Sequence, residues 1–242
     1  PGALQHIIIR GIERRKIFND DTDRENIIDR LDDIVTGTQT FCFGWALIPN
    51  HAHLLLRTGK TPISTVMRRL LTGYAVSYNR RHRRHGQLFQ NRYKSILCQE
   101  DTYLLELIRY IHLNPLRAKI VKHLKELDQY PYSGHSALMG KVKRGFQDTE
   151  YVLRLFGQKL SAARKAYRVY VQKGISQGRR PELVGGGLIR SAGGWSAVKA
   201  LRQEQARMKG DERILGDGEF VKSVLDAARE QFEERYRLEA QG

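Results

Sequence analysis

The order of strand-like and helix-like segments in the first half of the chain restricts its possible folds more than any other sequence feature. Strand-like segments are rich in β-branched, aromatic or alternating apolar residues, and they lie at 6–11, 40–48, 51–57 and 93–99. Helix-like segments carry apolar residues at helical spacing, and they lie at 20–37, 63–84 and 101–115. This order is most simply built as a ferredoxin-like α+β sheet, β-α-β-β-α-β-α, with helices on one face. We expect that fold, and the other face of the sheet could then be open.

Two histidines stand one residue apart in the strand-like segment 51–57. In an extended strand, the side chains of His51 and His53 point to one side, while Ala52 and Leu54 point to the other. The pair could be a metal site or two hydrogen-bonded histidines on a half-exposed strand. Two imidazoles leave a divalent ion under-coordinated, so a metal site also needs a third protein ligand.

The helix-like segment 101–115 presents a tyrosine and an amide together. Tyr110 and Asn114 are four residues apart and therefore lie one above the other on one helical face. Each also has a structural interpretation, Tyr110 as a core aromatic residue and Asn114 as a helix terminator before Pro115. His112 lies about 200° around the helix from Tyr110 and should face away from it.

The distribution of charge indicates a polyanionic partner. The formal net charge is +16, the pI is about 10.0, and no Asp or Glu occurs between Ile34 and Gln99. A solvated surface is the alternative, but such surfaces usually mix both signs. Aromatic residues interleaved with arginines in 73–93 suit stacking on single-stranded or hairpin DNA. We expect DNA contacts from Arg68, Arg69, Arg80, Arg81, Arg83, Arg84, Gln90, Arg92 and Lys94.

Composition favours a globular chain without a membrane span, because no apolar run has the required length. Cys42 and Cys98 lie in apolar stretches without metal-ligand spacing, which is typical of buried thiols in a reducing compartment.

Several stretches resemble one known family. The paired histidines of "LIPNHAHLLLRT" and the tyrosine and amide of "YLLELIRYIHLNPLRAKIV", together with "PGALQHIIIRGIERRKIF" and "GQLFQNRYKSIL", resemble the REP-associated tyrosine transposases. These are single-tyrosine HUH transposases of the IS200-like family, and the resemblance covers about residues 1–140. Ala52 replaces a bulkier apolar residue of the family pattern, which should be harmless because it faces away from the histidines.

The resemblance implies a specific chemistry. Tyr110 would attack a phosphodiester of single-stranded DNA and form a covalent 5′-phosphotyrosine, and His51, His53 and Asn114 would hold Mg²⁺ or Mn²⁺. The expected partner is single-stranded or hairpin (REP-like) DNA, with the protein a monomer or homodimer in the cytoplasm, associated with the nucleoid. Two alternatives stay open: a non-catalytic module that binds structured nucleic acid, and a metal nuclease that activates water.

The remainder of the chain, 141–242, is expected to be a helical extension of the catalytic domain 1–140, with DNA binding as one possible role. Helical periodicity covers 147–175, 195–210 and 218–241, and the Gly-rich segment 178–194 lacks the ending of a phosphate loop. Tyr167 and the basic residues around it could contact a DNA hairpin, or they could form a solvated helix face.

Overall fold

The computed structural model describes residues 1–178, 180–184 and 213–239, and these form two compact units. The first unit comprises Pro1–Ser95 with Leu105–Arg179, and the second comprises Ile96–Leu104 with Arg180–Gly242. The strands are β1 (Leu4–Arg10), β2 (Phe41–Ile48), β3 (His51–Arg57), β4 (Lys94–Cys98) and β5 (Ile214–Leu215). The larger helices are α1 (Asp21–Thr38), α2 (Ile63–Arg81), α3 (Glu100–His112), α8 (Leu160–Lys173) and α11 (Gly218–Glu239). Short helices are α4 (Asn114–Arg117), α5 (Leu124–Leu127), α6 (Gly134–Leu138) and α7 (Thr149–Arg154).

The expected α+β fold is confirmed. The strands form a mixed sheet in the order β2-β3-β1-β4-β5, in which the first four strands have the ferredoxin-like order. β3 pairs antiparallel with both β1 and β2, and the register sets Ile8 and Ala46 on either side of His53. The hairpin β2–β3 turns at Pro49-Asn50, as the turn-forming dipeptide predicts.

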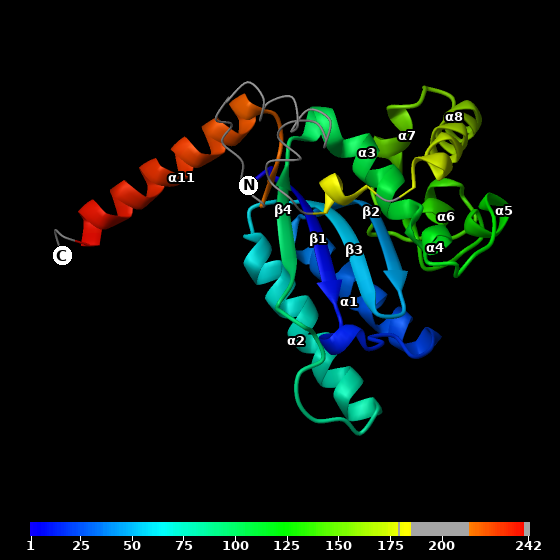
Figure 1. Ribbon diagram of the computed structural model, residues 1–242, viewed down its shortest axis with the longest axis horizontal. Helices are drawn as coiled ribbons and strands as arrows, with labels where there is room; N and C mark the ends of the chain where they lie inside the picture. Colours follow the sequence, from blue (N-terminus) through cyan, green and yellow to red (C-terminus); the bar gives the residue numbers. More distant parts are fainter. Residues whose placement is uncertain (179, 185–212, 240–242) are drawn as a thin grey trace, which may run out of the picture. The chain divides into compact units, whose positions relative to one another are not determined.

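One face of the sheet packs on α1 and α2 and forms the main hydrophobic core (Figure 1). Alternate residues of β1 and β3, including Ile7, Ile9, Ala52 and Leu54, are buried there. α1 begins where the Asp20 side chain accepts a hydrogen bond from the Asp23 amide, which is an ordinary N-cap. Each fully buried Leu or Ile on this face contributes roughly 1.5–3 kcal/mol to stability. Because Ala52 is one of the buried residues of this core, it faces the helices and not the histidines, as expected.

The opposite face is not open around the histidines, in contrast to our expectation. His6, Ile8, His53 and Leu55 all project from this face, and all four are buried. Cover comes from α3, whose Tyr110 ring meets the edges of His6 and His53. Further helices also contact this side at β2, namely α4, α6 and α7. Helices thus cover both faces of the sheet in the first unit.

Residues 147–175 form two helices and not one. The break falls between α7 and α8, where Gly157 adopts a φ of 146° that other residues rarely adopt. α8 buries Ala163, Tyr167 and Val171 on one side. Because these residues belong to the same compact unit as the sheet, the expected boundary after residue 140 does not separate compact units. As a division of function it stays a prediction.

In the second unit, β4 and β5 pair in parallel, with Leu97 opposite Ile214. α11 confirms the expected C-terminal helix, and its first turn is capped where Asp217 accepts from the Phe220 amide at 2.8 Å. The expected helix at 195–210 and most of the Gly-rich segment lie outside the described residues. Among the helices that are described, none combines the length and the apolar character needed to cross a membrane.

Candidate active site

The two histidines follow a turn that is held by backbone hydrogen bonds from residues outside the hairpin. His51 opens β3 directly after Pro49-Asn50. The carbonyl of Asn50 accepts from the Gly11 amide at 2.9 Å, and that of Pro49 accepts from the Ile17 amide at 2.7 Å. The two imidazole rings lie on one side of the strand with centroids 5.2 Å apart. The alternation predicted from sequence therefore brings both rings together.

His51 is held as a neutral imidazole with one free nitrogen lone pair. Its Nδ1 lies 2.7 Å from Asn50 Oδ1, an oxygen that only accepts, so Nδ1 carries the proton and Nε2 keeps its lone pair. Burial, with a smaller contribution from the positive charge of Arg10, lowers the pKa of His51 to about 4. The imidazole is therefore neutral at pH 7, as metal coordination requires.

His53 is tied to a second buried histidine. His53 Nδ1 lies 3.0 Å from His6 Nε2, and the two rings are stacked with centroids 5.2 Å apart. Burial first, and then the neighbouring His6, His51 and Arg10, hold the pKa of His53 well below its usual value. When Nδ1 carries the proton of this hydrogen bond, Nε2 is the nitrogen that remains for a ligand.

Tyr110 reaches the same place from α3. Its half-buried ring meets the edge of His53 with centroids 5.9 Å apart and the edge of His6 at 6.1 Å. The guanidinium of Arg117 lies 5.0 Å from the centre of the Tyr110 ring, and its Nη1 donates to the Tyr110 carbonyl at 3.2 Å. A cation so placed favours negative charge on the phenol. His112 points elsewhere and is buried, as its helical position predicted.

Asn114 is a buried amide with an unmet hydrogen bond. It begins α4 and is 7% exposed, and within the described part of the chain its Nδ2 has no hydrogen-bond partner. An unpaired buried amide group is costly, which points to a partner that arrives from outside the chain. Rotation of the side chain exchanges its oxygen and nitrogen, so this end can donate to a phosphate or serve as an oxygen ligand.

His51, His53 and Asn114, the metal ligands expected from sequence, are all neutral donors. Within the described residues, no group of three or more His, Cys, Asp or Glu is suited to hold a metal ion. The Asn114 amide oxygen stays the predicted third ligand beside the two imidazole nitrogens. Neutral donors of this kind fit Mn²⁺ or Mg²⁺ weakly, and a phosphate of the substrate would supply the missing negative charge.

The nine residues expected to contact DNA are spread over several surfaces. Gln90 lies near the site, because its amide donates to the Arg10 carbonyl at 2.9 Å and Arg10 pairs with His51 in the sheet. Arg68 and Arg69 are exposed on α2, the helix on the other side of the sheet. Six more follow towards or beyond the end of α2, all of them exposed or half-buried: Arg80, Arg81, Arg83, Arg84, Arg92 and Lys94.

Arg81 differs from the others because it already has acidic partners. Its Nη1 lies 2.6 Å from the buried Asp23, and its Nη2 lies 2.7 Å from Asp20. His82 also contacts Asp23 at 2.9 Å, so this histidine serves the same network. Tyr167, considered as a DNA contact in the sequence, is fully buried instead.

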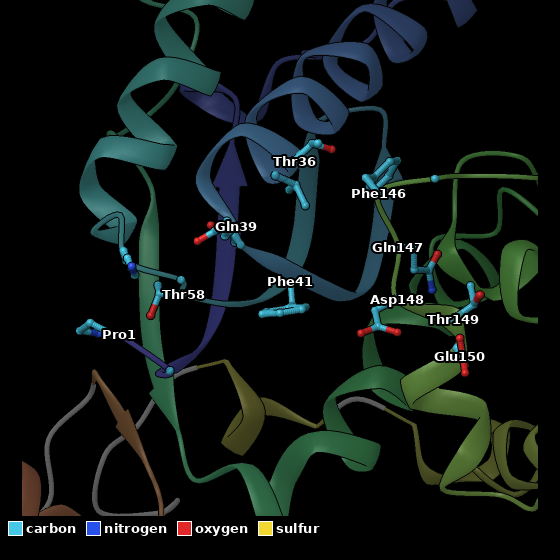
Figure 2. A pocket seen from close by; sticks show the side chains of 16 residues that line it. Pro1, Thr36, Gln39, Phe41, Thr58, Phe146, Gln147, Asp148, Thr149 and Glu150 are labelled. Carbon is cyan, nitrogen blue, oxygen red and sulfur yellow. The ribbon is translucent and has the colours of Figure 1, made fainter.

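An open pocket of about 890 Å³ lies at the other end of the β2–β3 hairpin (Figure 2). Thr36, Phe41 and Thr58 line it together with residues 145–150, and none of the expected site residues does so. Phe41 pairs with Arg57, whereas His51 pairs with Ile48. Along β3, Arg57 at the pocket end is six residues, or about 20 Å, from His51 and four residues, or about 13 Å, from His53.

Sequence reasoning missed three residues of the site: His6, Arg10 and Arg117. His6 and Arg10 alternate with core residues along β1, and the i, i+7 spacing places Arg117 two turns after Tyr110. Both signals were present in the sequence, but only the register of β1 on β3 brings His6 to His53.

Comparison with known proteins gives one family match. The sequence model of the family described as "Transposase IS200 like" matches residues 2–114, a range that includes both histidines, Tyr110 and Asn114. No curated protein matches the chain. Among solved structures, the REP-associated tyrosine transposase bound to a REP hairpin is 15% identical, with a TM-score of 0.48 over 61% of this chain and 84% of that one. A putative transposase from Deinococcus radiodurans R1 is 21% identical, with a TM-score of 0.34 over 43% and 85%.

Proposed function

From the match of residues 2–114 to the IS200-like transposases, we propose that this chain cleaves and rejoins single-stranded DNA through a covalent 5′-phosphotyrosine at Tyr110. The observation that carries the proposal is the meeting of Tyr110 with His53, at a ring distance of 5.9 Å, between elements far apart in sequence. A binding module would have no need to gather a tyrosine and paired neutral histidines at one point.

In the proposed reaction the Tyr110 oxygen attacks the phosphorus of a phosphodiester. The phenol loses its proton as the new oxygen–phosphorus bond forms, and the bond to the 3′ oxygen breaks, so that a 3′-hydroxyl leaves. The 5′-phosphate stays on the tyrosine, and attack by a 3′-hydroxyl reverses the step. Arg117 beside the ring stabilises the negative charge of the phenolate, and Arg10 beside His51 is placed to attract the substrate phosphate.

The neutral donors described above would hold the metal ion that the family chemistry requires. His51, His53 and the Asn114 oxygen would bind it, and a bound Mg²⁺ or Mn²⁺ supplies charge neutralisation at the scissile phosphate. The Asn50 and His6 contacts keep both imidazoles oriented before DNA arrives. We expect metal affinity to rise when a DNA phosphate is present.

We propose hairpin DNA of the REP type as the substrate, on the sequence resemblance and on the positive charge. Residues 34–99 contain no acidic residue, and the exposed arginines near the end of α2 can follow a phosphate backbone. The nine residues expected from sequence stay predicted contacts, with Arg81 the least available of them because of its ion pairs.

The test is incubation with labelled single-stranded hairpins and Mn²⁺, followed by a denaturing gel. We expect a shifted protein–DNA band that requires metal and is lost in Tyr110→Phe and in His51→Ala. Tyr93→Phe is the matched control, because Tyr93 lies in the basic segment and should leave the band unchanged.

Each other outcome refutes the proposal in a different way. Cleavage that survives Tyr110→Phe without a covalent band would identify water as the nucleophile. Binding without cleavage across single-stranded hairpins of varied loop and flank would identify a non-catalytic nucleic-acid-binding protein.

A further inference from the structure

A buried chain of polar side chains lies directly behind the candidate site. Tyr167 of α8 is fully buried, and its hydroxyl lies 2.7 Å from His112 Nδ1 and 2.8 Å from His135 Nδ1. His135 Nε2 lies 2.8 Å from Asp128 Oδ1, and Arg168 Nε donates to the other oxygen of that carboxylate at 2.9 Å. The proposed reaction uses none of these groups, although buried polar side chains are costly unless fully paired.

The protons of this chain can be ordered in one way only while both histidines are neutral. The Asp128 carboxylate accepts, so His135 donates from Nε2 and keeps a lone pair on Nδ1. The single proton of Tyr167 goes to that lone pair, and the Tyr167 oxygen then accepts from His112 Nδ1–H. Burial raises the pKa of Tyr167, so that its hydroxyl keeps its proton.

His112 is the end of this hydrogen-bonded series of side chains that lies next to the site residues in sequence. It is the last residue of α3, with Tyr110 two residues before it and Asn114 two residues after it. Its ring is enclosed closely: an added Cβ on Gly134 would lie 2.7 Å from His112 Nε2, and one on Gly44 would lie 3.3 Å from it. Contacts that hold His112 resist rotation of this end of α3, so Tyr110 keeps its direction towards His53 of β3.

We propose that Tyr167 is a positioning residue, which through His112 fixes the end of α3 that carries Tyr110 against the paired histidines. This rests on the proposed function of Tyr110. It assigns α8 to the catalytic machinery, although sequence reasoning placed it in an appended extension. The chain from Asp128 to His112 then links three elements, the turn after α5, α6 and α8, to the end of α3.

Tyr167→Phe tests this, because it removes one hydroxyl and keeps the ring. In single-turnover reactions with saturating hairpin DNA and Mn²⁺, we expect covalent adduct formation to slow by about 10- to 100-fold, as for a misplaced nucleophile. DNA affinity should stay within about twofold, since no DNA contact is lost. The matched control is Tyr74→Phe, which also removes a buried hydroxyl, one that donates to the Ile17 carbonyl on the other side of the sheet.

A second measurement tests the proton order of these hydrogen bonds without any reaction. In spectra of the downfield imidazole protons, Tyr167→Phe should shift or remove the His112 Nδ1–H signal and keep the His135 Nε2–H signal, which Asp128 still accepts. The His112 signal is identified as the one absent from His112→Asn. Loss of the His135 signal with the His112 signal unchanged would overturn the proton order.

The outcomes separate the two proposals. If the unaltered protein forms no adduct with hairpin DNA, the proposed function fails and the positioning role fails with it. If it forms the adduct and Tyr167→Phe does so at the same rate, or Tyr74→Phe slows it equally, only the positioning role is overturned. If Tyr167→Phe does not fold, two substitutions of His112 provide the test. His112→Asn retains a donor near the Tyr167 oxygen, so it should form the adduct at least tenfold faster than His112→Leu. Equal rates would refute the proposal.

Discussion

Replacing His6 by leucine should weaken metal binding at the candidate site without removing any proposed ligand. His6 is fully buried, and its Nε2 lies 3.0 Å from His53 Nδ1. For His53 to offer Nε2 to a metal ion, Nδ1 must carry the proton, and at a buried nitrogen that proton needs an acceptor within the protein. Leucine fills most of the volume but accepts nothing.

The expected magnitude follows from that single unmet hydrogen bond. A buried donor left without a partner costs about 1–3 kcal/mol, which corresponds to about 5- to 150-fold in an equilibrium constant. Loss of a residue that orients a metal-binding histidine typically lowers affinity by about 10- to 100-fold. The two ranges agree, so we expect the half-saturating Mn²⁺ concentration to rise by about 10- to 100-fold.

The assay is a Mn²⁺ titration of the rate of covalent adduct formation, with melting curves to verify the fold. The rate at saturating Mn²⁺ should change only a few-fold, and His6→Gln, which offers an amide oxygen, should recover part of the affinity. An unchanged Mn²⁺ requirement in a folded His6→Leu protein would refute the reasoning. A lower maximal rate at an unchanged requirement would instead place His6 with Tyr110, whose ring is 6.1 Å away.

Four further predictions concern stability and DNA affinity. Because the pKa of His51 falls to about 4 in the folded protein, against about 6.5 when unfolded, the unfolded state binds more protons in between. Metal-free stability should therefore fall as the pH is lowered from 6.5 to 4, and His51→Asn should flatten that slope in denaturant titrations. Arg81→Ala should lower the unfolding free energy in the same denaturant titrations, because it breaks ion pairs with two aspartates at the start of α1 and leaves the buried Asp23 without its guanidinium partner. Arg83→Ala should keep the stability unchanged, because the φ of 50° at this position strains either residue equally. It should reduce the number of ions released on hairpin binding, measured from the salt dependence of affinity, by about one. Gly134→Ala should destabilise by about 1–3 kcal/mol in the same titrations, since its Cβ would meet His112; unchanged stability would mean that the ring can move aside.

Local patterns predicted the fold and the position of both histidines on one side of a strand, because each depends on spacing within one element. The i, i+2 spacing put His51 and His53 on one side of β3, and Asp20 marked the start of α1. The extent of helices in 147–175 was predicted less well. Periodicity continued through Gly157, and only its left-handed backbone separates α7 from α8.

The supporting contacts escaped prediction because their partners are distant in sequence. His6 meets His53 across 47 positions, and His112 meets Tyr167 across 55. From sequence alone, the Arg and Lys residues around Tyr167 indicate a solvent-exposed helical face. The same helical spacing fits a solvated face and a buried polar cluster equally well. The assignment changes once Asp128 and His135 are in place, because they give the Tyr167 hydroxyl a paired position that is fully buried. The groups proposed to carry the reaction are thus recognisable from residue types at short range, whereas the groups that orient them depend on tertiary pairing. Substitution of the orienting groups is therefore the sharper test of whether this site transfers DNA strands.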